Sequence, residues 1–457
     1  MTFVGLTLGI VLQVAMAAAP TGRLEGRPPV SAASPLQAAI DRAADGATVT
    51  IPAGRYTGDL YIDRPMSVVG VGRPVLVASG RGSVIIVRSP GVRIEGFEIE
   101  ANFAGGLDRD SAGIHVSAPD VVIRDVHVRH AYFGIYLLTA NNATIERVVI
   151  RGDAARPPGE QGSGLHIYDS QQFHLIGNDV SDVRDGIYIQ SSSGGVVRGN
   201  DVRHVRYGLH YMYADDNLFE DNRFEDSDAG AALMFSRRLT FRRNRFLRNR
   251  GFASVGLLLK DCDDLLAEDN VMADNARGIF LEGSNRNTFR RNLLAVSDAA
   301  LVIFGSSSGN VFRDNAFVAN LTPLELVGRR TDTIFDGNYW SDADEPDFDG
   351  DGYRDRPFRV VNVLDHFRGR TTASDLLAHG PAARALAAAE RSFPVLRVVD
   401  VVDAHPRVRF PDGMAQTSLA PTAPRSQAGA GLVFSMAMLA LGALAVRSGR
   451  RQARRAA

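Results

Sequence analysis

Soft metal-binding side chains recur at a fixed spacing in the middle of the chain. His210 and Met212 are separated by one residue, and Met234 follows Met212 by twenty-two positions. Imidazole and thioether groups are ligands that suit Cu(I), and His166 offers a further imidazole earlier in the chain. If the fold brings these four side chains to one surface, they form a candidate copper site. The alternative is that the histidines pack against tyrosines and the methionines are adaptable contacts for a partner protein.

A second candidate metal site is acidic and lies nearer the C-terminus. The segment DFDGDGYRD at residues 347–355 follows the D-x-D-x-D-G-x-x-D spacing that places carboxylates around a hard cation. Phe358 occupies the position of the chelating glutamate of an EF-hand, so the pattern predicts a structural calcium loop of another kind. The alternative is a hydrated acidic turn. The candidate calcium ligands are Asp347, Asp349, Asp351 and Asp355.

Composition narrows the classes of function. The formal net charge is -1, so no general positive field attracts nucleic acid, and we predict no nucleic-acid partner. Cys262 is the single cysteine, which excludes an internal disulfide and a four-cysteine zinc or iron–sulfur site within one chain. Any soft metal must therefore be bound by methionine and histidine.

An internal repeat sets the positions of these side chains. Glycines open apolar pentapeptides at Gly164, Gly186, Gly208, Gly230, Gly256 and Gly278, with steps of 22, 22, 22, 26 and 22 residues. An asparagine stands fourteen residues after each glycine, and the series is Asn178, Asn200, Asn222, Asn244, Asn270 and Asn292, continued by Asn315 and Asn338. Each unit contains only short alternating strands and turns, without a stretch long enough for a crossover helix.

This pattern predicts an all-β fold, a right-handed parallel β-helix built as a single-stranded solenoid. About 12 coils of about 22 residues are expected, with capping elements at both ends. The asparagines are expected at turns, where their amides bond one coil to the next and where a left-handed backbone is tolerated. Residues 22 positions apart then become neighbours on adjacent strands.

The strands that follow the glycines predict an outward strip. Offsets one and three from each glycine are apolar and should point inward, so offsets two and four should point outward. Offset two contains His115, Tyr136, His166, Tyr188, His210, Ala232, Leu258 and Phe280, and offset four includes Met212, Met234, Lys260 and Glu282. An exposed strip rich in aromatic, His and Met side chains is typical of a binding face. Two insertions, residues 151–163 and four residues before Gly256, enter at the same corner and should flank it.

The ends of the chain predict export and tethering. Residues 1–19 have the pattern of a signal peptide, and residues 428–446 form an uncharged apolar run followed by arginines, as in a membrane anchor with a cytoplasmic tip. A helical stretch is expected at residues 372–391. The expected order is signal peptide 1–19, linker 20–35, N-terminal cap helix 36–50, β-helix 51–345, calcium-loop and helical C-terminal cap 346–410, disordered linker 411–427, transmembrane anchor 428–446 and basic cytoplasmic tip 447–457.

Two other functions remain open on this fold. A carbohydrate-active β-helix enzyme, such as a polysaccharide lyase, hydrolase or epimerase, needs outward carboxylates clustered for acid–base chemistry. The predicted strip carries only Glu282 beside Lys260, so no catalytic residue is assigned. The third possibility is a β-helix adhesin or docking scaffold, against which the basic tip argues.

Four motifs resemble those of the NosD family of periplasmic maturation factors. They are GLHYMYADDN at 208–217, ALMFSRRL at 232–239, LLLKDCDD at 257–264, and GNYWSD with its DGDGYRD tail at 337–355. The resemblance covers roughly residues 35–410. It implies a non-enzymatic periplasmic protein that helps to furnish the copper–sulfur centre of nitrous oxide reductase.

The same resemblance implies partners and contact residues. The partners would be an ABC transporter made of a permease and an ATPase, a copper-donor lipoprotein, and the reductase apoprotein. The matching segments add contact residues to Tyr188 of the strip, so the candidate partner-binding residues are Tyr188, Tyr211, Tyr213 and Lys260. The expected location is the periplasm, with the C-terminal segment tethering the protein to the inner membrane.

Overall fold

The computed structural model describes residues 35–80, 82–102, 111–251, 253–328, 331–360 and 401–411. The predicted signal peptide, the helix at 372–391, the anchor at 428–446 and the basic tip lie outside the described residues. Within the described ranges, no helix has both the length and the apolar character needed to cross a membrane.

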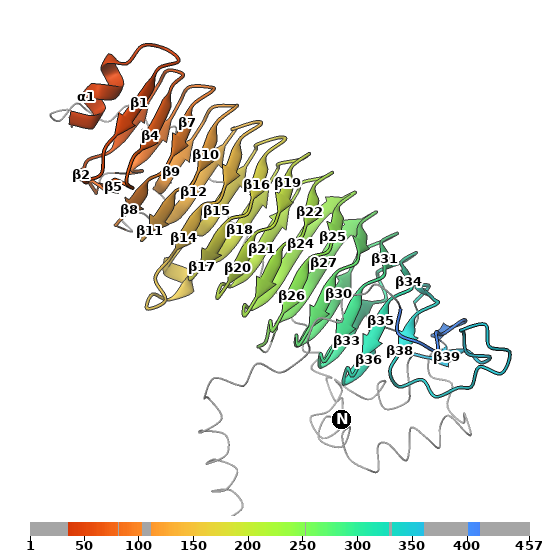
Figure 1. Ribbon diagram of the computed structural model, residues 1–457. Coiled ribbons are helices and arrows are strands. Elements are labelled where there is room, and N and C mark those ends of the chain that lie inside the picture. Colours follow the sequence, from red (N-terminus) through yellow and green to blue (C-terminus); the bar gives the residue numbers. More distant parts are fainter. Residues whose placement is uncertain are drawn as a thin grey trace, which may run out of the picture. The chain divides into compact units, whose positions relative to one another are not determined.

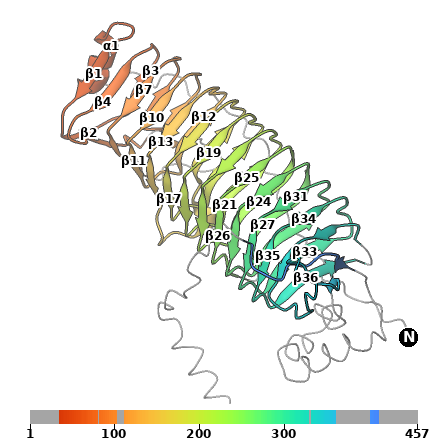
Figure 2. The same ribbon diagram turned by 45° about the vertical axis from the view of Figure 1, so that its right-hand side comes forward.

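The described chain winds into a right-handed parallel β-helix, as predicted. Its strands form three long sheets, and every third strand in the sequence belongs to the same sheet (Figures 1 and 2). The second sheet has 13 strands, one for each coil, which agrees with the expected dozen. All pairings between coils are parallel, and only β39 and β40 pair antiparallel.

In each sheet the strands lie side by side in chain order, except that β40 precedes β39 in the first sheet. The first contains β1 (Thr48–Ile51), β4 (Ser67–Gly70), β7 (Arg93–Glu95), β10 (Val122–Arg124), β13 (Thr144–Glu146), β16 (His174–Ile176), β19 (Val196–Arg198), β22 (Leu218–Glu220), β25 (Thr240–Arg242), β28 (Leu266–Glu268), β31 (Thr288–Arg290), β34 (Val311–Arg313), β37 (Ile334–Asp336), β40 (Val402–Asp403) and β39 (Phe358–Arg359). The second contains β2 (Arg55–Thr57), β5 (Val75–Val77), β8 (Glu98–Glu100), β11 (His127–Arg129), β14 (Val149–Arg151), β17 (Asp179–Ser181), β20 (Asp201–Arg203), β23 (Arg223–Glu225), β26 (Arg245–Leu247), β29 (Val271–Ala273), β32 (Leu293–Ala295), β35 (Ala316–Val318) and β38 (Tyr339–Trp340). The third contains β3 (Leu60–Ile62), β6 (Ile85–Val87), β9 (Ala112–Val116), β12 (Phe133–Leu138), β15 (Ser163–Tyr168), β18 (Asp185–Gln190), β21 (Tyr207–Met212), β24 (Ala229–Arg237), β27 (Val255–Asp263), β30 (Arg277–Glu282), β33 (Ala299–Phe304) and β36 (Thr322–Val327).

The asparagine series forms a buried ladder, which confirms the predicted bonding between coils. The Asn222 side chain donates from Nδ2 to Asn244 Oδ1 at 2.9 Å and to the Val197 carbonyl at 2.8 Å. The backbone N–H of Asn222 donates to the same Asn244 oxygen at 3.0 Å. The left-handed conformation was expected at the asparagine but occurs one residue earlier. Asp221 has a φ of 56°, and Asn222 is not among the residues with positive φ.

Both ends of the stack are covered. Helix α1 (Pro35–Arg42) places Leu36 and Ile40 against the first coil, and β1 already begins inside the range predicted for the cap helix. At the other end, the buried carboxylate of Asp403 accepts from Asn338 Nδ2 at 2.9 Å and from Trp340 Nε1 at 3.0 Å. Residues 401–411 therefore fasten to the last rung of the ladder.

Insertions enter at one corner of the coil, between the second and third sheets. Residues 152–162 join β14 to β15 and contain the 3-10 helix η1 (Pro158–Glu160), which projects from the side of the stack (Figure 1). The longer loop between β26 and β27 enters at the same corner. Both insertions adjoin the edge of the third sheet, as the sequence predicts.

Candidate functional site

The outer face of the third sheet carries a continuous column of rings. Strand pairing aligns His115, Tyr136, His166, Tyr188 and His210 in successive coils. The ring centroids are separated in turn by 5.0, 4.6, 4.4 and 5.0 Å. The column ends at His210, because Ala232 is the next residue in register.

Three of the four candidate copper ligands meet at the end of this column. Strands β21 and β24 pair so that Met212 lies opposite Met234 and His210 lies opposite Ala232. Paired residues of neighbouring strands point to the same face at a spacing of about 4.8 Å. Met234 is buried and Met212 is half-buried. Two thioethers and one imidazole therefore share one small patch of the outer face.

Asp185 is a member of this site that the sequence analysis missed. His210 Nδ1 lies 3.2 Å from Asp185 Oδ2, and Asp185 is fully buried. Arg206 donates to the two oxygens of Asp185, from Nε at 2.9 Å and from Nη2 at 2.8 Å. Burial alone would raise the pKa of Asp185, but His210 and Arg206 hold that pKa well below its ordinary value.

The ionised Asp185 determines which nitrogen of His210 is available. A carboxylate accepts hydrogen bonds and cannot donate them, so the Nδ1 atom of His210 carries the proton. When the ring is neutral, Nε2 holds the free lone pair, as in metal-binding histidines backed by a carboxylate. One signal was present in the sequence, since Asp185 is a lone acid at a position occupied by Ser163, Tyr207, Ala229 and Val255 in nearby coils.

His166 does not join this patch, so its assignment as a copper ligand is corrected. The ring of Tyr188 lies between His166 and His210 and stacks on His166 at an interplanar angle of 10°. His166 is itself buried, and burial lowers its pKa to about 3. Two strand spacings separate it from His210, which is too far for one metal ion to be shared.

The predicted exposure of the strip was wrong for its N-terminal half. His115, Tyr136 and His166 point outward but are buried. Tyr132 and Phe133, at the start of β12, form a second apolar cluster with Tyr136 on the outer face. Phe133 also packs on the His166 ring with centroids 4.6 Å apart, so neighbouring rings cover part of this face.

Two predicted partner contacts are also corrected. Tyr211 is fully buried in the core, where its hydroxyl donates to the Ala214 carbonyl at 2.7 Å, because offset three points inward. Tyr188 is 8% exposed, and its hydroxyl donates to Gln190. Neither residue is accessible to a partner.

The other two predicted contacts reach the surface. Tyr213 is 53% exposed and stacks on the exposed Phe235 with centroids 5.0 Å apart. Lys260 lies beside Met234 in register and forms a half-buried ion pair with Glu282 at 3.1 Å. The partly accessible part of the strip therefore begins at Met212 and continues through Lys260 and Glu282, with Met234 buried between them.

The acidic loop gathers three of its four candidate calcium ligands. Carboxylate oxygens of Asp347, Asp349 and Asp351 lie within 4.8 Å of one another. Asp355 is not in this group, and its Oδ2 accepts the backbone N–H of Phe348 at 2.6 Å.

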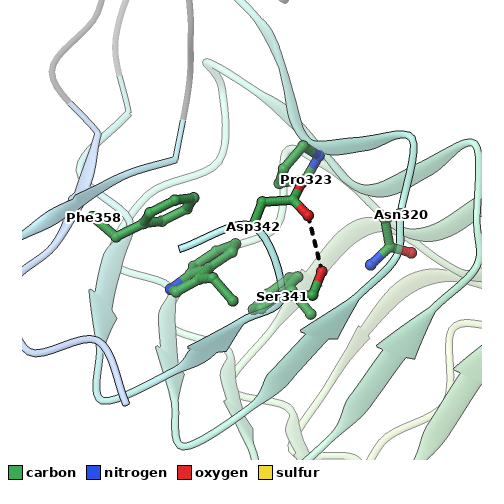
Figure 3. Close-up of a pocket in the computed structure, with 7 residues that line it drawn as sticks. Asn320, Pro323, Ser341, Asp342 and Phe358 are labelled. Atoms are coloured by element: carbon green, nitrogen blue, oxygen red, sulfur yellow. Dashed lines mark hydrogen bonds between the residues drawn. The ribbon is translucent and has the colours of Figure 1, made fainter. Parts of the chain in front are cut away.

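A pocket lies at the C-terminal edge of the described stack. It is lined by Phe317, Asn320, Pro323, Trp340, Ser341, Asp342 and Phe358 (Figure 3). Ser341 donates to Asp342 at 3.1 Å, and the rings of Trp340 and Phe358 stack with centroids 5.1 Å apart. This pocket brings no metal-binding set together, and it lies several coils from His210.

The fold and the site together define the class of protein. It is a right-handed parallel β-helix that carries a patch of methionine and histidine side chains on the outer face of one sheet. Residues 147–345 match a family model described as "Periplasmic copper-binding protein (NosD)". Over 381 residues the chain is 31% identical to "Probable ABC transporter binding protein NosD" of Pseudomonas aeruginosa, covering 79% of this chain and 88% of that protein. The chain belongs to the NosD family.

Further comparisons agree with this assignment and with the fold. The protein of the same name from Stutzerimonas stutzeri is 29% identical, with 79% of this chain and 86% of that protein covered. Among solved structures, the A-modules of the mannuronan C-5 epimerases AlgE4 and AlgE6 of Azotobacter vinelandii match with TM-scores of 0.52 and 0.54. Each is 17% identical to this chain. The AlgE4 match covers 65% of this chain and 93% of its own, and the AlgE6 match covers 67% of this chain and 94% of its own. This likeness concerns the fold alone.

Proposed function

We propose that this protein binds Cu(I) at His210, Met212 and Met234 and transfers it in the periplasm. The observation that carries the proposal is the strand register, which sets Met212 opposite Met234 and beside His210 on one face. The description of the matched family as copper-binding supports it. Copper is here a cargo rather than a resident cofactor.

The chemistry of the three ligands suits a transfer site. Thioether and imidazole nitrogen are neutral and favour Cu(I) over the hard cations Mg²⁺ and Ca²⁺. Asp185 lies behind His210 and keeps Nε2 as the ligand atom. Three protein ligands leave a coordination position for a donor or acceptor group, as open metal sites do.

The finer role follows from the family resemblance. The cargo would serve the copper–sulfur centre of nitrous oxide reductase, and the names of the relatives support work with an ABC transporter. We propose three kinds of partner. They are the permease and ATPase of the ABC transporter, a copper-donor lipoprotein and the reductase apoprotein. The segment 428–446 would tether the protein to the inner membrane.

Ion pairing weighs against the enzyme alternative. On the described part of the third sheet near the site, Asp185 is buried in a cluster with Arg206 and His210, and Glu282 pairs with Lys260. Acid–base catalysis needs a carboxyl group that reaches substrate with a pKa near the working pH. Asp185 meets neither condition, so binding and transfer is the function that these residues favour.

Anaerobic Cu(I) titration of the full chain against a chromophoric chelator tests the proposal. Met212→Leu with Met234→Leu should weaken Cu(I) binding by about 100-fold, because two of three ligands are lost while side-chain volume is kept. Met272→Leu is the matched control, since Met272 is a fully buried core residue of the next coil. Unchanged affinity in the double variant would contradict the site.

We also propose that Asp347, Asp349 and Asp351 bind a structural calcium ion. The loop contacts the segment that closes the stack, through the Arg354 N–H donated to the Pro406 carbonyl at 2.8 Å. Calcium at 100 times its Kd should add about 2.7 kcal/mol to the free energy of unfolding of this region.

Thermal unfolding with and without calcium measures this effect. Asp349→Asn should remove the calcium-dependent gain in Tm, and Mg²⁺ at equal concentration is the control ion because it requires a smaller octahedral site. Equal Tm values with and without calcium would leave the loop a hydrated acidic turn.

A further inference from the structure

The corner that follows each strand of the third sheet from β12 to β30 takes a left-handed residue. Equivalent positions in successive coils have φ between 47° and 60°, and they are Thr139, Asp169, Ser191, Tyr213, Phe235, Asp261 and Gly283. Small or polar residues occupy most of these positions, as this backbone conformation favours. Aromatic residues stand only in the two adjacent coils that carry Met212 and Met234.

Packing does not account for these two aromatic residues. Tyr213 and Phe235 are 53% and 38% exposed, so neither fills the core. Their rings stack nearly parallel, at an interplanar angle of 8°, and form one flat aromatic surface. A large aromatic residue with positive φ carries backbone strain that asparagine or glycine would relieve.

The ring pair adjoins the proposed copper ligands. Tyr213 directly follows Met212, Phe235 directly follows Met234, and the Tyr213 N–H donates to the Met234 carbonyl at 3.2 Å. A protein that exchanges a metal ion with these methionines has to approach this corner.

Opposite charges pair on the turn that follows the ring pair. Arg238 pairs with Asp216 at 2.7 Å and with Asp215 at 3.1 Å. Asp261, an exposed carboxylate, stands at the position equivalent to Phe235 in the next coil. The surface offered to a partner is thus the aromatic ring pair with an acidic side chain at its edge. Aromatic side chains are the usual anchors of protein interfaces.

We infer that Tyr213 and Phe235 form the docking anchor for a Cu(I)-carrying protein that presents an apolar surface beside its metal site. This inference rests on the proposed copper function. Docking at the two rings brings the carrier's metal to the methionines, where direct ligand exchange can follow. Cu(I) stays Cu(I) throughout, so no electron is transferred.

Tyr213→Asn with Phe235→Asn tests the inference in the full chain. Asparagine tolerates the left-handed conformation, so the thermal midpoint should stay equal or rise. Cu(I) uptake from the lipid-free domain of the copper-donor lipoprotein should slow by at least about tenfold. Uptake from a small Cu(I)–glutathione complex, which needs no docking, should be unchanged.

Val296→Asn is the matched control. Val296 is also exposed, at 42%, with a φ of 54°, but it follows β32 of the second sheet, at another corner. This variant should gain stability and keep the wild-type rate with both copper sources.

The outcomes separate the two proposals. If the double variant takes Cu(I) from the carrier at the wild-type rate, or if it unfolds more easily than the wild type, the docking role is overturned. If the wild-type chain takes no Cu(I) even from the glutathione complex, the copper function itself is wrong. Slow transfer from the carrier alone supports the anchor.

Discussion

Asn222→Ala is expected to lower the free energy of unfolding by roughly 3–5 kcal/mol, because it leaves several buried polar groups without partners. The lost Nδ2 group donates to the Val197 carbonyl of the preceding coil and to Asn244 of the following coil. The lost Oδ1 atom accepts from the backbone and the side chain of Asn200 in the preceding coil. Water cannot replace these bonds without opening the stack, since Asn222 is fully buried.

Urea denaturation measures the total loss, and hydrogen exchange locates it. Exchange should quicken first in the coils on either side of residue 222, because each coil contacts only its neighbours. Asn142→Gly is the control, since Asn142 is exposed, its φ of 54° is one that glycine adopts without strain, and its side chain donates to Asp120. A loss below about 1 kcal/mol would show that the ladder positions the turns without stabilising them.

The second large effect is acid destabilisation caused by the buried ring column. Burial lowers the pKa of His166 to about 3, and burial with the charge of Arg88 lowers the pKa of His115 to about 4. Both rings are neutral in the folded protein near pH 5, whereas an unfolded chain protonates them below about pH 6.5. Folding stability is therefore fully present above pH 6.5 and is lost as the pH falls toward these folded-state values.

The expected size follows from the proton affinities. Each histidine should lower the free energy of unfolding by about 1.4 kcal/mol per pH unit below pH 6.5. At pH 4.5 the loss should be about 2–3 kcal/mol for each histidine. Urea denaturation at pH 7 and at pH 4.5 measures the difference. His166→Phe, which keeps an aromatic ring in the stack, should remove about half of it.

The control for this experiment is His204→Phe. The His204 side chain is 57% exposed, so its ring remains largely hydrated after folding. A pH dependence that is the same in His166→Phe as in the wild type would mean that the buried column is protonated without loss of the fold.

The architecture of this protein could be predicted from spacing, although part of the site could not. Gly208 and Gly230 are 22 residues apart, and their strands are adjacent in the structure. Met212 and Met234 therefore became neighbours as expected. The sequence analysis failed at Asp185, which contacts His210 across 25 positions rather than 22. Comparing equivalent positions singles out Asp185 as an unusual acid, but it does not pair that acid with His210.

Burial was the other quantity that spacing could not supply. The outward direction of Tyr188 and His166 was predicted, but their burial was not, because the spacing does not show that rings of other strands, such as Phe133 on His166, pack over this face. Successive residues of a strand point to opposite faces, so Tyr211 lies in the core whereas Met212 points outward. Its assignment as a contact came from a motif and conflicted with that alternation.

The sequence by itself determined the coil, its period, the asparagine ladder and the pairing of the two methionines. The reason is that stacked strands turn a difference of 22 residues into a contact, whatever the side chains are. Only the tertiary structure decided which outward side chains meet water, and it alone revealed the carboxylate behind His210. Those features depend on how side chains lean between coils and on where insertions fold, and neither is periodic in the sequence.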